Sequence, residues 1–179
     1  EGIGLVVGER AIECVEERGN AKESMKDLGF EDAHGVGVID QYIEGAADVG
    51  NGAEVEIARV TMEGDDPKSG TPLKLNGAPD PNGYDALVFA SPVQAFSLAQ
   101  AMVLYLNQLP KFEAKKVLFF TTQHLKKSWL GANHAIRQAK ALIAAKGTAV
   151  TGTGAVHWSS EQREEQIEAL IQTFTELLI

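Results

Sequence analysis

The sequence predicts an α/β fold: a doubly wound, five-stranded parallel sheet with helices on both faces, a three-layer αβα sandwich. Five short runs rich in apolar and β-branched residues alternate with longer stretches of helical character. Three of these runs are continuously apolar, which is typical of strands that are covered on both faces. Because strand–helix–strand connections are right-handed, such an alternation places helices on both sides of one sheet.

The five expected strands are spread along the whole chain. They are Ile3–Val7, Glu54–Val60, Ala86–Ala90, Lys116–Thr121 and Ala149–His157. The first, third and fourth contain the unbroken runs IGLVV, ALVFA and KVLFFT. We therefore expect these three to form the buried middle of the sheet.

Helices are expected after the third, fourth and fifth strands. Apolar residues recur there at intervals of three and four, over residues 95–106, 136–143 and 167–178. This spacing puts one apolar stripe on a helix. Phe96 falls inside the first stripe, so a packing role in that helix is one interpretation of this ring.

Two segments do not fit the regular alternation. Residues 8–53 exceed what one crossover helix needs, and we expect an enlarged helical segment with pieces near 9–28 and 36–48. Residues 61–83 are rich in Gly, Pro, Asp and Asn, and we expect a long surface loop there. Without a repeat or a linker, the sequence predicts a single domain over residues 1–179.

Charge and composition exclude several classes of function. The 179 residues include 16 Lys and Arg against 25 Asp and Glu, a net charge of -9. This charge repels nucleic-acid backbones and anionic lipids, so we expect neither as a partner. The single cysteine, Cys14, permits no internal disulfide, and no signal peptide or apolar run of about 20 residues is visible. A cytoplasmic protein is the expectation.

The candidate site lies in the loops that follow the third and fourth strands, because open parallel sheets bind ligands at the carboxyl ends of their strands. These loops offer hydroxyls, amides and aromatic rings but no carboxylate, so they suit a planar heteroaromatic ring better than a metal or acid–base catalysis. No G-x-S-x-G nucleophile motif is present. The candidate residues are Ser91, Pro92, Val93, Gln94, Ala95, Phe96, Thr121, Thr122, Gln123, His124 and Trp129.

The segment YDALVFASPVQAFSLAQAMVLYLNQLP, followed by KKVLFFTT, resembles the third and fourth strands of flavodoxins and related FMN-binding proteins. The likeness extends over residues 53–179. It implies a sheet of order 2-1-3-4-5 and an FMN cofactor that transfers one or two electrons. It also implies a redox partner protein or a small-molecule electron donor or acceptor. Carried over, Ser91–Phe96 is the flavin-ring loop, Thr121–His124 is the second loop, and Phe96 or Trp129 stacks on the ring.

The sequence departs from that family after the first strand. Flavodoxins carry a T-x-T-G-x-T phosphate loop there, whereas this chain reads Gly8-Glu9-Arg10-Ala11. Arg18–Ala21 and His34–Gly37 are possible substitutes, but neither segment has a hydroxyl. Two hypotheses follow: an FMN-binding electron carrier or small oxidoreductase, and a flavodoxin-like domain that has lost flavin and serves as a protein-binding or assembly module.

Overall fold

The sheet, its helices and the loops at one end of the sheet make up the part of the chain that can be described. The computed structural model describes residues 2–8, 54–63, 74–114 and 116–178. The helical pieces expected near 9–28 and 36–48 lie outside these ranges, as do Cys14 and the candidate phosphate segments after Gly8.

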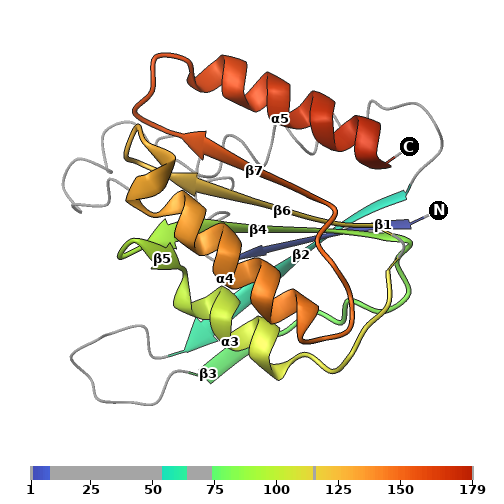
Figure 1. The fold of residues 1–179 in the computed structure, drawn as a ribbon. Coiled ribbons are helices and arrows are strands. Elements are labelled where there is room, and N and C mark those ends of the chain that lie inside the picture. Colours follow the sequence, from blue (N-terminus) through green and yellow to red (C-terminus); the bar gives the residue numbers. More distant parts are fainter. Residues whose placement is uncertain (1, 9–53, 64–73, 115, 179) are drawn as a thin grey trace, which may run out of the picture.

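One mixed sheet of seven strands organises these residues (Figure 1). Its order is β3-β2-β1-β4-β6-β7, with β5 paired to β4. Parallel pairs join β2 to β1, β1 to β4, β4 to β6 and β6 to β7, whereas β3 and β5 run antiparallel to their neighbours. The strands are β1 (Gly2–Gly8), β2 (Glu54–Glu63), β3 (Lys74–Gly77), β4 (Ala86–Gln94), β5 (Ser97–Leu98), β6 (Lys116–Gln123) and β7 (Gly152–His157).

The expected sheet of five parallel strands in the order 2-1-3-4-5 is therefore corrected: the observed order contains two further strands, β3 and β5, and both run antiparallel to their neighbours. The expected loop at 61–83 is wrong in part, since β2 continues to Glu63 and β3 lies within it. β3 has only four residues, alternately exposed and half-buried, and such a short polar edge strand has the composition of a loop. The single-domain organisation stays a prediction.

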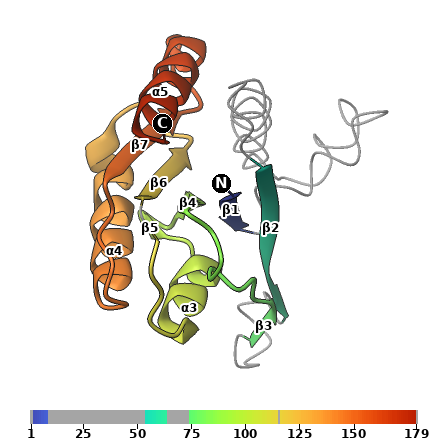
Figure 2. The same cartoon turned by 90° about the vertical axis from the view of Figure 1, so that its right-hand side faces the viewer.

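Helices cover both faces of the sheet (Figure 2). α3 (Gln100–Gln108) and α4 (Ala132–Ala144) lie on one face, and α5 (Arg163–Leu178) lies on the other. Successive residues of β4 and β6 point to opposite faces. Leu87 and Phe89 pack with α3 and α4, whereas Val88 and Ala90 pack with α5. The continuous apolar runs of β4 and β6 thus supply side chains to a hydrophobic core on each face of the sheet. This arrangement confirms an α/β fold.

No helix in the described ranges has both the length and the apolar character that crossing a membrane requires.

Tyr105 of α3 is fully buried in the core between this helix and the sheet. Its ring packs against Phe89 with centroids 6.4 Å apart, and its hydroxyl donates to the carbonyl oxygen of Pro79 at 2.7 Å. Burial raises the pKa of Tyr105 far above its ordinary value, and the charge of Asp80 and the nearby Tyr84 raise it further. The folded protein therefore holds this phenol in its neutral form.

Stability should fall as the pH rises above about 10, the pKa of tyrosine in unfolded chains. The direction of this change follows because the pKa of Tyr105 is higher in the folded than in the unfolded protein. The free energy that the neutral phenol contributes to folding is fully present below pH 10, and it is lost as the pH rises toward the folded pKa. Urea unfolding of the wild type and Tyr105→Phe at about pH 8 and pH 10.5 tests this. The variant should lose about 1 kcal/mol at pH 8 and show a shallower decline above pH 10. Equal declines in the two proteins would contradict the role of Tyr105.

Candidate functional site

The chain adds strands on both sides of β1: β2 lies on one side of it and β4 on the other, so the strand order changes direction at β1. The crevice at such a reversal, beyond the carboxyl ends of the strands, is where open α/β sheets bind ligands. In this register Val7 faces Ala90, and Pro92 faces Thr122. The parallel strands therefore end together at one edge, to which the arrowheads point in Figure 1. We call the loops at this edge, residues 91–96 and 121–131, the rim.

The first rim loop is a hairpin rather than the start of a helix. β4 continues through Gln94, Ala95 and Phe96 form a two-residue turn, and β5 returns antiparallel. α3 begins only at Gln100, so the helical stripe expected from residue 95 is wrong at its beginning. Phe96 is consequently not a core residue of a helix: it lies at the hairpin tip with 62% of its surface exposed.

This hairpin has an unusual backbone. Ala95 and Phe96 have φ angles of 47° and 62°, the left-handed region that two-residue hairpin turns require. Glycine normally occupies these positions because it lacks a Cβ, and asparagine is tolerated through local hydrogen bonds, whereas for other residues the left-handed conformation costs roughly 1–2 kcal/mol each. Strain of this kind is concentrated at functional sites, where the surrounding structure holds it in place.

Side chains from α4 hold the strained hairpin. His134 Nδ1 lies 3.3 Å from the carbonyl oxygen of Phe96, and the backbone N–H of Leu98 donates to Gln138 Oε1 at 2.9 Å. Within the loop, the N–H of Gln100 donates to Gln94 Oε1 at 3.2 Å. Sequence reasoning missed His134 and Gln138 because their partners lie about 40 residues away.

The second rim loop is wrapped around the buried amide of Gln123. Gln123 Oε1 accepts from the backbone N–H of Ala132 at 2.8 Å, and Nε2 donates to the carbonyl oxygens of Leu125 and Lys127, both at 2.8 Å. The loop then forms the short 3-10 helix η3 (Ser128–Leu130). At its centre Trp129 is 69% exposed. Gln123 therefore shapes the loop from within.

Gly131 brings the two loops into contact. Its φ is 137°, and a Cβ at this position would lie 2.6 Å from Val93 Cγ1 and 3.2 Å from the Cα of Phe96. Only glycine permits both this backbone angle and this close approach. The structure thus joins the two groups of residues that the sequence analysis placed at one site.

The candidate residues differ in what they can reach. Thr121 donates its hydroxyl to the carbonyl oxygen of Ser91 at 2.7 Å inside the protein, so this pair ties β4 to β6. The exposed residues are the ones placed to touch a ligand. Ser91, Thr121, Thr122 and Gln123 are buried, Pro92, Val93 and Gln94 are half-buried, and Ala95, Phe96, His124 and Trp129 are exposed.

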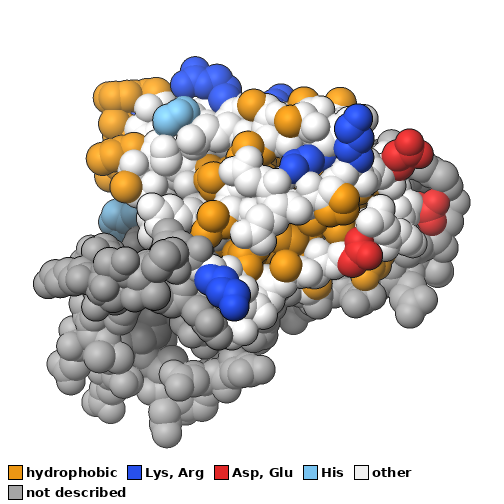
Figure 3. Space-filling view, turned by 90° about the horizontal axis from the view of Figure 1, so that it is seen from below, with side chains coloured by type: hydrophobic (Ala, Val, Ile, Leu, Met, Phe, Trp, Pro, Cys, Tyr) orange, Lys and Arg blue, Asp and Glu red, His pale blue; other side chains and the backbone are white. Residues whose placement is uncertain are grey.

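The rim exposes large apolar side chains and contains no acidic residue. Phe96, Leu125 and Trp129 are the exposed large apolar residues of the described part of the chain, and Figure 3 shows hydrophobic side chains gathered at this end of the molecule. No Asp or Glu occurs between Glu113 and Glu161, although the chain as a whole is acidic. An aromatic ligand with an anionic group would meet no repulsion from this segment.

The sheet, its helices and the rim at the switch point define the class: the protein has a flavodoxin-like fold. No protein-family model matches the sequence, and no curated protein sequence matches it significantly. Solved structures do. The azoreductase of Bacillus anthracis superimposes with a TM-score of 0.56 at 12% identity, covering 98% of each chain.

Two further structures agree. An apo NADH:FMN oxidoreductase gives a TM-score of 0.54 at 13% identity, covering 98% of this chain and 88% of that one. The Fusobacterium nucleatum flavodoxin bound to flavin mononucleotide gives 0.51 at 12% identity, covering 98% and 97%. These likenesses establish the fold.

Proposed function

We propose that this chain binds FMN at the rim and acts as an electron carrier or a small flavin oxidoreductase. The observation that carries the proposal is the strained hairpin at Ala95 and Phe96. It keeps the ring of Phe96 exposed at the carboxyl end of β4, and its backbone packs against Gly131 in the loop that bears Trp129. Similarity in fold to an FMN-bound flavodoxin and to an NADH:FMN oxidoreductase supports FMN as the cofactor.

The exposed residues of the rim suit an isoalloxazine ring. Phe96 or Trp129 would stack on the ring face, while backbone N–H and C=O groups of residues 91–96 and 121–124 would bind its polar edge. When bound, FMN supplies one- or two-electron transfer, and the protein supplies binding and orientation. The electrons would pass between the flavin and a redox protein or a small molecule. The phosphate position of the resembled family falls at residues 9–11, outside the described ranges, so the proposal concerns the ring.

Titration of the purified chain with FMN tests the proposal. Stacking on an aromatic ring should quench flavin fluorescence. At a hundredfold excess over Kd, FMN should also stabilise the native state by about 2.7 kcal/mol, a rise in Tm of roughly 5–10 °C. Absence of both effects at saturating FMN would overturn the proposal and favour a domain without flavin.

Matched variants of Trp129 and Phe96 separate stacking from other binding. Trp129→Leu should weaken binding, whereas Trp129→Tyr, which keeps an aromatic face, should retain most of it. The pair Phe96→Leu and Phe96→Tyr makes the same comparison at the hairpin. If neither ring matters, the flavin lies elsewhere.

A further inference from the structure

Three polar side chains from separate elements form a hydrogen-bonded row beside the rim. Ser128 Oγ, in η3, lies 2.9 Å from Nε2 of His157, the last residue of β7. His157 Nδ1 lies 3.2 Å from Oε1 of Gln166 on α5. His157 is only 8% exposed, whereas Ser128 is half-buried and reaches the surface.

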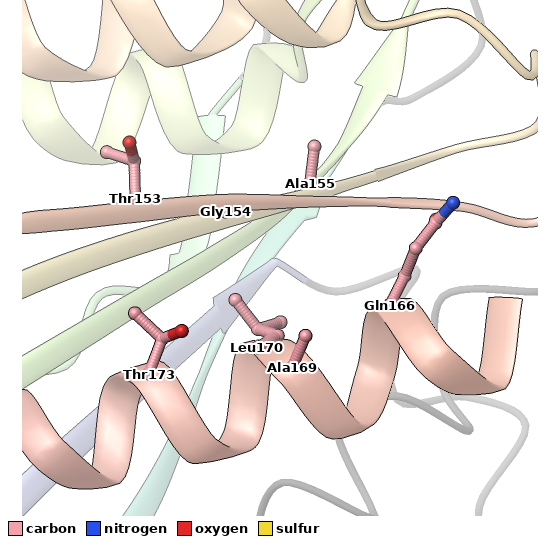
Figure 4. Close-up of a pocket in the computed structure, with 7 residues that line it drawn as sticks. All are labelled: Thr153, Gly154, Ala155, Gln166, Ala169, Leu170 and Thr173. Carbon is pink, nitrogen blue, oxygen red and sulfur yellow. The ribbon is translucent and has the colours of Figure 1, made fainter. Parts of the chain in front are cut away.

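Close packing of α5 on β7 makes this row possible. Gly154 has no side chain, and a Cβ there would lie 2.2 Å from Leu170 Cδ1, so the helix approaches the strand closely. Figure 4 shows Gln166 reaching from α5 toward β7 at one end of a shallow pocket of about 250 Å³ between them. On the other side, the N–H of Trp158 donates to the carbonyl oxygen of Gln123 at 2.8 Å, which fixes the end of β7 beside the second rim loop.

The hydrogen bonds determine which nitrogen of His157 carries the proton. The backbone N–H of His157 donates to Gln166 Oε1 at 2.8 Å, so the atom facing the histidine must be the carbonyl oxygen of the amide. That oxygen can only accept, and Nδ1 beside it therefore carries hydrogen. Nε2 is left with its lone pair directed at Ser128 Oγ, which donates to it.

We propose that Ser128 is a nucleophile, with His157 as its general base and Gln166 as the residue that positions His157. A hydroxyl within hydrogen-bond reach of a base that a third group orients is the arrangement of nucleophilic catalysis. The substrate class is an activated aryl ester, since Trp129 and Leu125 expose apolar surface in the same loop for an aryl group. This activity does not require bound FMN, although both ligands would use the exposed ring of Trp129.

In the proposed reaction Ser128 Oγ attacks the carbonyl carbon of the ester, and its proton passes to His157 Nε2. The bond from the carbonyl carbon to the aryloxy oxygen breaks, and the phenol leaves with that proton. Water then attacks the acyl-serine and gives its proton to Nε2. The bond to Oγ breaks, Oγ regains the proton, and the carboxylic acid departs.

A second serine and histidine pair, Ser97 of β5 and His134 of α4, lies next to the rim and provides a matched control. Ser97 Oγ lies 3.5 Å from His134 Nδ1. The same Nδ1 faces the carbonyl oxygen of Phe96 at 3.3 Å, which requires it to donate. Nδ1 of His134 is therefore unable to take a proton from Ser97, and Ser97 should be unreactive.

Labelling of the full chain with a fluorophosphonate tests the proposal, because Oγ forms a bond to phosphorus as fluoride leaves. Trypsin releases residues 128–137, SWLGANHAIR, in which Ser128 is the one hydroxyl residue. We expect a single label, located on Ser128 by fragmentation. Ser128→Ala should lower the labelling rate by on the order of 10²-fold or more, and Ser97→Ala should leave it unchanged.

Gln166→Glu distinguishes catalysis from a structural network. The carboxylate keeps the oxygen that accepts from Nδ1, and its charge favours the imidazolium that forms during attack, so labelling and hydrolysis of p-nitrophenyl acetate should accelerate, by roughly tenfold. Hydrogen bonds that only hold the loop would give no acceleration. A label elsewhere, equal labelling of Ser128→Ala, or no labelling above that of a surface hydroxyl would each overturn the proposal.

Discussion

Phe174→Ala is expected to lower the free energy of unfolding by about 3–5 kcal/mol, which is typical of the loss of a buried aromatic ring. Phe174 on α5 is 0% exposed, and its ring meets the edge of Phe120 with centroids 6.1 Å apart. Its removal leaves a cavity between the sheet and α5, lined by Leu118 and Val156 among others. Because a domain of this size has about 5–15 kcal/mol in total, the variant should be close to its limit of stability.

Urea unfolding at 25 °C measures this loss, and Phe96→Ala is the matched control. The same substitution at the exposed hairpin tip removes much less buried surface, because Phe96 is 62% exposed, so it should change stability by only about 0.5 kcal/mol. Similar losses in the two variants would show that α5 is not packed on the sheet as described. Phe174→Leu, which preserves most of the volume, should fall between them.

Gln123→Leu is expected to destabilise the protein by about 2–4 kcal/mol and to open the second rim loop. Leucine has a similar size, but it leaves the N–H of Ala132 and the carbonyl oxygens of Leu125 and Lys127 without their partner. The loop should then move to hydrate these groups. Both FMN binding and labelling of Ser128 should weaken, because each depends on this loop.

Limited trypsin digestion reports the opening directly, since Lys126 and Lys127 lie in the loop. Cleavage there should be faster in Gln123→Leu than in the wild type. Gln172→Leu is the matched control: Gln172 is exposed on α5 and bonds to Glu176 at 3.1 Å. It should unfold and digest like the wild type, and a protected loop in Gln123→Leu would refute the role of the buried amide.

The sequence predicted the elements whose residues repeat a simple pattern. The runs ALVFA and KVLFFT are unbroken because β4 and β6 are covered by helices on both faces. In α5 the spacing of Ile167, Leu170 and Phe174 matches the stripe that is buried. Such patterns depend on neighbours along the chain and on burial alone, so they are visible without a structure.

The hairpin at Ala95 and Phe96 shows where this reasoning fails. Leu98 and Met102 are buried in the same core as expected, but Leu98 belongs to β5 and only Met102 to a helix. Burial alone does not distinguish the two arrangements. The turn also lacks the glycine or asparagine that usually announces such a hairpin, because contacts from His134 and Gln138 replace the local preference.

By itself the sequence determined the α/β class, the central strands, the helix of the carboxyl terminus and the two loops in which a ligand site was expected. Only the tertiary structure decided that the two rim loops pack together at Gly131 and that the buried amide of Gln123 bonds to the backbone of the second loop. It also decided that Ser128, His157 and Gln166 form one hydrogen-bonded row. The reason is physical: periodicity records which face of an element is buried, whereas a site depends on contacts between residues that the chain brings together from distant positions.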